Sequence, residues 1–311
     1  MFRNTIMVAI EVENIFKSYG TKKAKVQALK GISFEVARGE LFGIIGPDGA
    51  GKTSLFRILT TLLLADDGTA VVDGCDVVKD YKKIRQRVGY MPGKFSLYPD
   101  LSVIENLEFF ATIFNTSVSD NYELIKDIYS QIEPFKDRKA GKLSGGMKQK
   151  LALSCALIHR PSVLFLDEPT TGVDAVSRKE FWAMLKSLQE KGITILVSTP
   201  YMDEAALCDR VALIQNGSIL SINTPAQIVA AFGKPIFGVR ANNMLQLLTD
   251  VKKMPEVERA YPSGIYHNVI MKTGNNGEAL RKNLESALNG ELEMVTLQPT
   301  IEDCFMELMH Y

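Results

Sequence analysis

Residues 46–53 read GPDGAGKT, and this stretch decides how the rest of the chain is organised. It fits the pattern G-x-x-x-x-G-K-[ST], a phosphate-binding loop that joins a strand to a helix. Residues 40–45 before it are a short apolar run typical of a buried strand. Residues 54–64 after it are largely apolar and contain no Gly or Pro, which favours a helix. A glycine-rich turn without a ligand does not account for the Lys and Thr that follow the last glycine.

The loop predicts a site for a triphosphate and Mg²⁺. Glycines let backbone N–H groups turn onto phosphate oxygens, and the helix N-terminus adds partial positive charge. Lys52 is expected to reach the β- and γ-phosphates, and the Thr53 hydroxyl to hold Mg²⁺. The predicted nucleotide-contacting residues are Gly46, Pro47, Asp48, Gly49, Ala50, Gly51, Lys52, Thr53 and Ser54.

Length and composition indicate a two-domain globular protein. The chain has 311 residues, 46% hydrophobic and 23% charged, with a formal net charge of zero, which gives no argument for a nucleic-acid partner. No apolar run reaches the length of a membrane span, and the N-terminus does not resemble a secretion signal. The four cysteines form no CxxC pair, so we expect small buried thiols in a reducing cytoplasm.

A second apolar strand, residues 163–168, ends in Asp167 and Glu168. Ligands of open α/β sheets lie beyond the carboxyl ends of strands. Asp167 is therefore placed to hold Mg²⁺, and Glu168 to orient and deprotonate an attacking water. A solvated acidic turn is the plainer interpretation, but so apolar a strand beside a phosphate-binding loop argues against it.

Residues 142–149, KLSGGMKQ, begin a helix predicted to end near His159, before Pro161. The Ser144 cap with Gly145 and Gly146 leaves N–H groups free, so this is a second candidate anion-binding helix start. From the residues alone, a plain helix cap explains it equally well.

The remaining pattern predicts an antiparallel β region over residues 7–36, with Tyr19 near the end of its first run. Tyr19 is either a base-stacking aromatic or a half-exposed strand-end residue, and the residues favour the second interpretation. The pattern also predicts β residues 68–78, 88–92 and 193–197, and helices 102–114 (with a capping box), 121–132 and 201–208.

In their order and in their residues, these motifs resemble those of the ATP-binding cassette family over residues from about 8 to 225. The segment LSGGMKQ at 143–149, here called the signature segment, is the most specific of them. The resemblance implies an α/β P-loop ATPase domain over residues 1–225. It has a mixed sheet core, an antiparallel β subdomain and a helical subdomain at about 95–160.

The resemblance also implies roles and partners. Two cassettes pair head to tail, with each ATP between one phosphate-binding loop and the other cassette's Ser144, Gly145 and Gly146. Tyr19 becomes the adenine-stacking aromatic, and Asp174 lies at the dimer seam. A separate membrane permease would hold the subunit on the inner face of the membrane. Its coupling helix would dock around residues 93–108, which carry Phe95, Leu97 and Tyr98.

Two positions depart from the family pattern. Gly93 stands where the family usually has Gln, and Pro200 where it usually has a His that reaches the γ-phosphate. Pro200 also suits the first turn of a helix capped by Thr199. A lost hydrogen bond to a charged group is worth about 1.5–3 kcal/mol, roughly one to two decades in rate. One hypothesis is therefore a weak cassette that completes the site of a different partner cassette.

Residues 226–311 read β-α-β-β-α-β, a ferredoxin-like α+β accessory domain. Thr300 and Asp303 predict a capping box for a last helix. We expect its apolar face to pack on its own domain; this face carries Ile301, Cys304, Phe305, Leu308 and Met309. The ending also looks like the C-terminal extension of cassettes that serve exporters with a separate permease.

The leading interpretation is the ATPase subunit of an exporter of drugs or other amphipathic compounds. The segments GPDGAGKT and GKLSGGMKQKL resemble those of the multidrug-export branch of the family. A non-transport cassette acting on ribosomes or DNA is disfavoured, because the chain has one cassette, no heptad array and no basic surplus. A nucleotide-dependent structural subunit without meaningful hydrolysis is the third class.

Overall fold

A computed structural model describes residues 7–21, 24–94, 96–274, 277–287 and 292–309. The chain divides into two compact units, Met1–Pro225 and Ala226–Tyr311, and each is described by itself. Among the described residues, no helix has both the length and the apolar character needed to cross a bilayer. Phe95, predicted to belong to a coupling surface, lies outside the described residues.

The first unit is built on a six-stranded sheet in the order β10-β9-β3-β8-β7-β6. Five strands run parallel, and β10 pairs antiparallel with β9 at one edge. The bounds are β3 (Leu41–Ile45), β6 (Val88–Met91), β7 (Val163–Asp167), β8 (Thr194–Thr199), β9 (Arg210–Gln215) and β10 (Ser218–Asn223). Residues of β3, β7 and β8 are buried throughout, as expected of parallel strands covered on both faces. The carboxyl ends of these three neighbouring strands therefore meet at one edge of the sheet.

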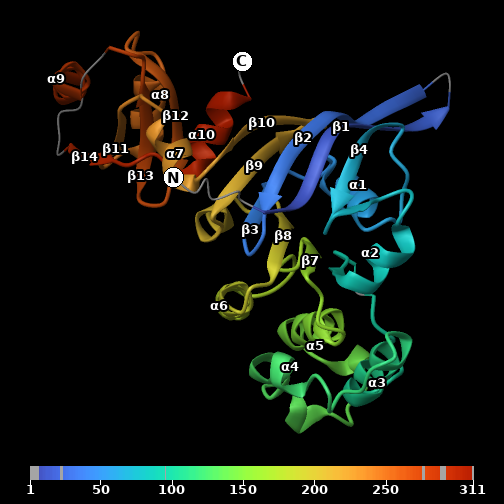
Figure 1. The fold of residues 1–311 in the computed structure, drawn as a ribbon. Coiled ribbons are helices and arrows are strands. Elements are labelled where there is room, and N and C mark those ends of the chain that lie inside the picture. Colours follow the sequence, from blue (N-terminus) through green and yellow to red (C-terminus); the bar gives the residue numbers. More distant parts are fainter. Residues whose placement is uncertain (1–6, 22–23, 95, 275–276, 288–291, 310–311) are drawn as a thin grey trace, which may run out of the picture. The chain divides into compact units, whose positions relative to one another are not determined.

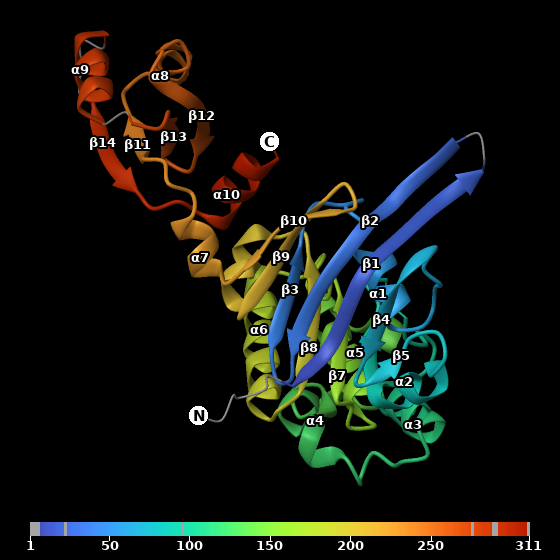
Figure 2. The ribbon, with the colours of Figure 1, turned by 45° about the horizontal axis from the view of Figure 1, so that its top comes forward.

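A four-stranded antiparallel sheet, ordered β2-β1-β4-β5, packs on this core. Its strands are β1 (Val8–Thr21), β2 (Ala24–Ala37), β4 (Asp67–Val72) and β5 (Cys75–Asp76). β1 and β2 lie side by side as a long ribbon (Figures 1 and 2). The rings of Phe34 in β2 and Phe42 in β3 stack with centroids 5.5 Å apart, which joins the two sheets.

Helices α3, α4 and α5 gather at one end of this unit, away from the β1–β2 ribbon (Figure 1). The bounds in the unit are α1 (Lys52–Leu59), α2 (Tyr81–Arg87), α3 (Val103–Ile113), α4 (Tyr122–Tyr129), η1 (Glu133–Phe135), η2 (Ala140–Lys142), α5 (Gly145–Leu157), α6 (Ala175–Glu190) and η3 (Met202–Leu207). The predicted capping box of Ser102 and Glu105 is confirmed, as is the Ser144 cap. All four cysteines are free and buried, as predicted.

Several predicted bounds were too long, and some elements were missed. The helix predicted to reach residue 64 ends at Leu59 as α1, and Thr61 two residues later takes a left-handed φ of 64°. The helix predicted to reach residue 132 ends at Tyr129 as α4. α2, α6 and the β9–β10 hairpin were not predicted. The sequence does contain a signal for this hairpin, the pair Asn216-Gly217. In the structure both residues take a positive φ in the two-residue turn, as an Asn-Gly hairpin turn requires.

The second unit contains an antiparallel sheet ordered β12-β13-β11-β14, the order of a ferredoxin-like fold. Its elements are α7 (Pro225–Ala230), β11 (Ile236–Arg240), α8 (Met244–Val251), β12 (Val257–Ser263), β13 (Tyr266–Met271), α9 (Gly277–Ala287), β14 (Glu293–Leu297) and α10 (Ile301–Leu308). The α10 capping box is confirmed, and Ile301, Cys304 and Phe305 are buried. Cys304 Sγ contacts the Ile228 carbonyl of α7, so this apolar face packs within its own unit, as expected.

Candidate nucleotide-binding site

The loop at 46–53 runs from the end of β3 into α1 in a conformation that its glycines permit. Gly51 takes a φ of 105°, in the left-handed region that side chains disfavour. A Cβ at Gly51 would lie 2.4 Å from the Ala28 carbonyl oxygen, and one at Gly46 would lie 2.1 Å from the Ile214 carbonyl oxygen. The loop is therefore held close to the neighbouring backbone, and the Gly46 N–H donates to the Thr199 carbonyl at 3.2 Å.

Lys52 is held inside this loop and its side chain is only 2% exposed. Its ammonium donates to the carbonyls of Gly46 at 2.8 Å and Pro47 at 3.0 Å. It also pairs with Glu168 Oε1 at 3.0 Å. The sequence placed Lys52 and Glu168 in different motifs, and the fold brings them into direct contact.

Asp167 ends β7, and Glu168 follows with a left-handed φ of 51°. A non-glycine residue in this region costs about 1–2 kcal/mol, so neighbouring bonds must hold it. The Glu168 N–H donates to the carbonyl and the Oγ of Ser198 in β8, at 3.1 and 3.0 Å. This turn directs the Glu168 carboxylate toward the phosphate-binding loop.

Asp167 and Thr53 supply oxygens that suit Mg²⁺. Asp167 is 2% exposed, and burial raises the pKa of its carboxyl, opposed by hydrogen bonds from the hydroxyls of Ser198 and Thr53. A buried carboxylate next to a hydroxyl and an ammonium fits a site that gains a cation together with a triphosphate. Among the described residues no cluster of three or more His, Cys, Asp or Glu side chains forms a metal site by itself.

Tyr19 of β1 lies at the start of α1. Its hydroxyl is 3.0 Å from the Ser54 Oγ, and the residue is 42% exposed. The ring is thus open to solvent beside the phosphate-binding loop, a position from which it can stack on a base.

The signature segment lies at the N-terminus of α5. Ser144 Oγ accepts the Met147 N–H at 3.3 Å, and Ser144 and Gly145 are exposed. A Cβ at Gly146 would lie 2.7 Å from Ser177 Oγ of α6, so the segment packs closely on the start of that helix. Asp174 caps α6 by accepting the N–H groups of Val176 and Ser177. The signature segment and Asp174 therefore meet at the start of α6.

Of the two departures from the family pattern, Gly93 has a structural explanation. A Cβ at Gly93 would lie 2.9 Å from the Asp167 carbonyl oxygen, so the chain after β6 approaches β7 closely. The prediction that Thr199 caps a helix containing Pro200 was wrong. Thr199 is the last residue of β8, and η3 is preceded by Tyr201.

Sequence reasoning missed a buried network at this strand end. Glu204, 2% exposed, accepts hydrogen bonds from Thr170 at 2.8 Å and Thr199 at 2.5 Å, with Arg178 of α6 at 3.9 Å. Thr199 Oγ1 in turn accepts the Tyr201 N–H at 3.1 Å. These contacts explain how the chain turns after β8 without a helix cap. The only sequence signal was a polar pair, Ser198-Thr199, that ends an apolar strand.

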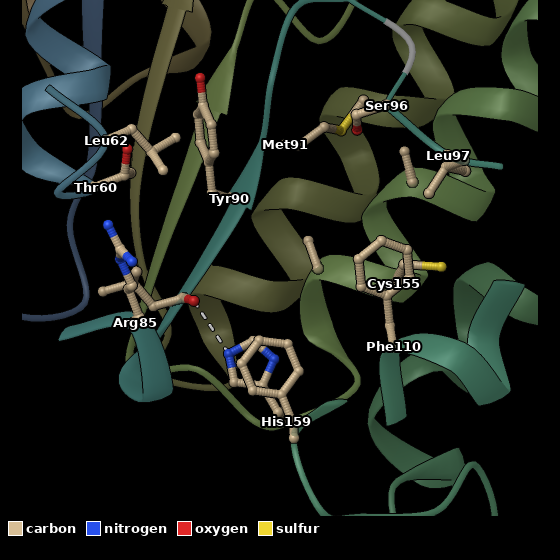
Figure 3. A pocket seen from close by; sticks show the side chains of 14 residues that line it. Thr60, Leu62, Arg85, Tyr90, Met91, Ser96, Leu97, Phe110, Cys155 and His159 are labelled. Carbon is tan, nitrogen blue, oxygen red and sulfur yellow. Dashed lines mark hydrogen bonds between the residues drawn. The ribbon is translucent and has the colours of Figure 1, made fainter. Parts of the chain in front are cut away.

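A cavity of about 300 Å³ lies between β6 and the helices α3 and α5. Figure 3 shows Thr60, Leu62 and Arg85 on one side of it and Leu97, Phe110 and Cys155 on the other. Leu97 is buried, whereas Tyr98 beside it is 46% exposed and packs edge-on against Phe109 at 4.6 Å. The Asn106 amide binds the N–H and the carbonyl of Tyr98, which fixes this loop.

The strand–loop–helix with a buried lysine, facing two strand-end carboxylates, defines a P-loop nucleotide-binding domain. Residues 29–171 match the family model described as "ABC transporter". The Nod factor export ATP-binding protein I of Burkholderia lata is 40% identical over 223 residues, 71% of this chain and 72% of that protein. The chain belongs to the ATP-binding cassette family.

Two further relatives differ in coverage. The probable multidrug ABC transporter ATP-binding protein YbhF of Escherichia coli is 40% identical over 71% of this chain, but the match spans only 38% of its own length. The linearmycin resistance ATP-binding protein LnrL of Bacillus subtilis is 29% identical over 96% of this chain and 97% of its own. A dimeric post-hydrolysis cassette bound to ADP and Pi superimposes with a TM-score of 0.63 at 25% identity, over 69% of this chain and 98% of that one.

Proposed function

We propose that this chain is the ATP-binding subunit of an export complex, and that it binds and hydrolyses ATP to drive a separate membrane permease. The contact between Lys52 and Glu168 beside Asp167 carries the proposal, because it gathers a phosphate ligand, a general base and a cation ligand at one sheet edge. The names of three relatives refer to multidrug transport, Nod factor export and linearmycin resistance. A drug or other amphipathic compound is therefore the proposed cargo.

In the proposed reaction, Lys52 leaves Glu168 and binds the β- and γ-phosphates. Glu168 then accepts a proton from the attacking water, a general-base step worth about 10²–10⁴ in rate. Thr53 and Asp167 would hold Mg²⁺, and the bound ion would neutralise charge that develops on the phosphates. Tyr19 stacks on the adenine.

A second cassette would complete the site. Ser144 and Gly145 are exposed at the start of α5. In the proposed assembly, this corner faces the phosphates bound to the other cassette, with Asp174 at the seam.

The cavity beside Tyr98 is the proposed docking site for the permease, which would place the subunit on the inner face of the membrane. Purification of the tagged chain from detergent-solubilised membranes is expected to recover an integral membrane protein. Truncation of an anchoring aromatic costs about 2 kcal/mol or more, so Tyr98→Ala should weaken this recovery about 30-fold. Leu245→Ala, at a residue of the second unit that is 82% exposed, is the control. Equal recovery of the permease by Tyr98→Ala and the control would contradict this assignment.

A second candidate function follows from Gly93 and Pro200, which supply no side-chain donor. In it, the chain hydrolyses ATP slowly at its own loop and mainly lends its signature segment to a different cassette. The loss of one charged hydrogen bond predicts that the isolated chain turns over ATP at least about tenfold more slowly than the complex extracted from membranes. Equal turnover per site in the two preparations would rule out this asymmetric arrangement.

A further inference from the structure

Ser198 lies at the junction of the strands that carry the candidate site. β8 is between β3, which leads into the phosphate-binding loop, and β7, which ends in Asp167. In register, Ser198 lies opposite Ile44 on one side and Asp167 on the other. The next residue, Thr199, accepts the Gly46 N–H through its carbonyl at 3.2 Å. The end of β8 therefore joins both halves of the site.

The Ser198 hydroxyl bonds to both acidic residues. It donates to Asp167 Oδ1 at 2.7 Å and accepts the Glu168 N–H at 3.0 Å. Ser198 is 0% exposed, so water does not replace these bonds. One buried hydroxyl thus fixes the side chain of the first carboxylate and the backbone of the second.

We propose that Ser198 is a positioning residue of the ATP site, whose hydroxyl holds the Asp167 carboxylate in the orientation that receives Mg²⁺. The inference rests on the proposed function. A hydrogen bond to one oxygen restricts the rotation of a carboxylate, and Asp167 is bonded by both Ser198 and Thr53, the second residue proposed to hold the cation. Loss of such an outer hydrogen bond typically lowers metal affinity or activity about 10–100-fold.

The effect on Glu168 is expected to be smaller. Its N–H also donates to the Ser198 carbonyl at 3.1 Å, and that acceptor stays when the hydroxyl is removed. Ser198→Ala should therefore weaken mainly the binding of Mg²⁺. A general loss of order at the strand end would also weaken the binding of ATP without Mg²⁺.

The test measures ATP affinity of the full chain with Mg²⁺ and with EDTA, using a fluorescent ATP analogue. The ratio of the two affinities is the Mg²⁺ gain. Ser198→Ala should lower this gain about tenfold or more while leaving the affinity in EDTA within about twofold. Ser198→Thr keeps the hydroxyl and should restore most of the gain.

Ser154→Ala is the matched control, because Ser154 is also 0% exposed and donates to a backbone carbonyl, that of Lys150, at 2.8 Å. A gain unchanged in Ser198→Ala, or lowered equally in both alanine variants, would overturn the proposal for Ser198 alone. If the unmodified chain shows no Mg²⁺ gain, the proposed function fails and this inference fails with it. Thermal unfolding of each variant, followed by circular dichroism, shows whether the comparison is between folded proteins.

Discussion

Glu168→Gln is expected to slow ATP hydrolysis at this chain's own site about 10²–10⁴-fold. Glutamine has nearly the shape of glutamate and keeps an oxygen for Lys52, but it cannot accept a proton from water. The left-handed turn at residue 168 should be unchanged by the substitution, because the Glu168 N–H donates to the carbonyl and the hydroxyl of Ser198, and both acceptors stay in place. The substitution should therefore slow the chemical step of hydrolysis and leave the fold of the site intact.

The measurement is single-turnover hydrolysis of radiolabelled ATP with the chain in excess, so that even a slow rate of hydrolysis can be measured. ATP binding should be as tight as in the unmodified chain, or tighter, because Lys52 no longer has to leave a charged partner 3.0 Å away. Glu190→Gln, at an exposed position at the end of α6, should hydrolyse ATP normally. If Glu168→Gln hydrolyses at the unmodified rate, the general-base role is wrong and a structural subunit becomes the better account.

Lys52→Ala is expected to weaken ATP binding about 100-fold or more. Two contacts between its ammonium and the phosphates would each contribute about 1.5–3 kcal/mol, and at least 3 kcal/mol together corresponds to about two decades. The substitution also leaves the Glu168 carboxylate without its cation and next to the phosphates, which adds repulsion between like charges.

Equilibrium binding of ATP by calorimetry checks this prediction. Lys126→Ala on α4 is the control, since Lys126 is exposed and pairs with Glu123 on the same helix. An affinity for Lys52→Ala within about threefold of the control would mean that the loop binds phosphate without its lysine, contrary to the proposed site.

The sequence predicted the site's strand ends and helix starts because each is coded locally. An apolar run followed by glycines and a Lys-Thr pair specifies the turn at 46–53, and the apolar run 163–167 specifies where the two carboxylates emerge. Caps at Ser102, Ser144 and Thr300 were predicted for the same reason, since each bond spans three residues.

What the sequence did not predict depends on contacts between distant segments. The Lys52–Glu168 pair joins the first residue of α1 to the residue that follows β7, and the Ser198 side chain in β8 bonds to Asp167 in β7. The sequence predicted a helix start at Pro200, because Thr is a common helix cap. In the structure the Thr199 hydroxyl donates to the Glu204 carboxylate instead. Only the register of β3, β8 and β7 brings these groups together.

Mixing two inactive variants tests most directly the claim that one ATP lies between this chain's phosphate-binding loop and a second cassette's signature segment. Lys52→Ala removes the loop function, and Ser144→Arg blocks the exposed signature corner. Each variant alone should show little single-turnover hydrolysis, while their mixture should recover a substantial part of the unmodified rate, because one intact composite site can form. A mixture as inactive as its components, under conditions in which the unmodified chain hydrolyses ATP, would contradict the account.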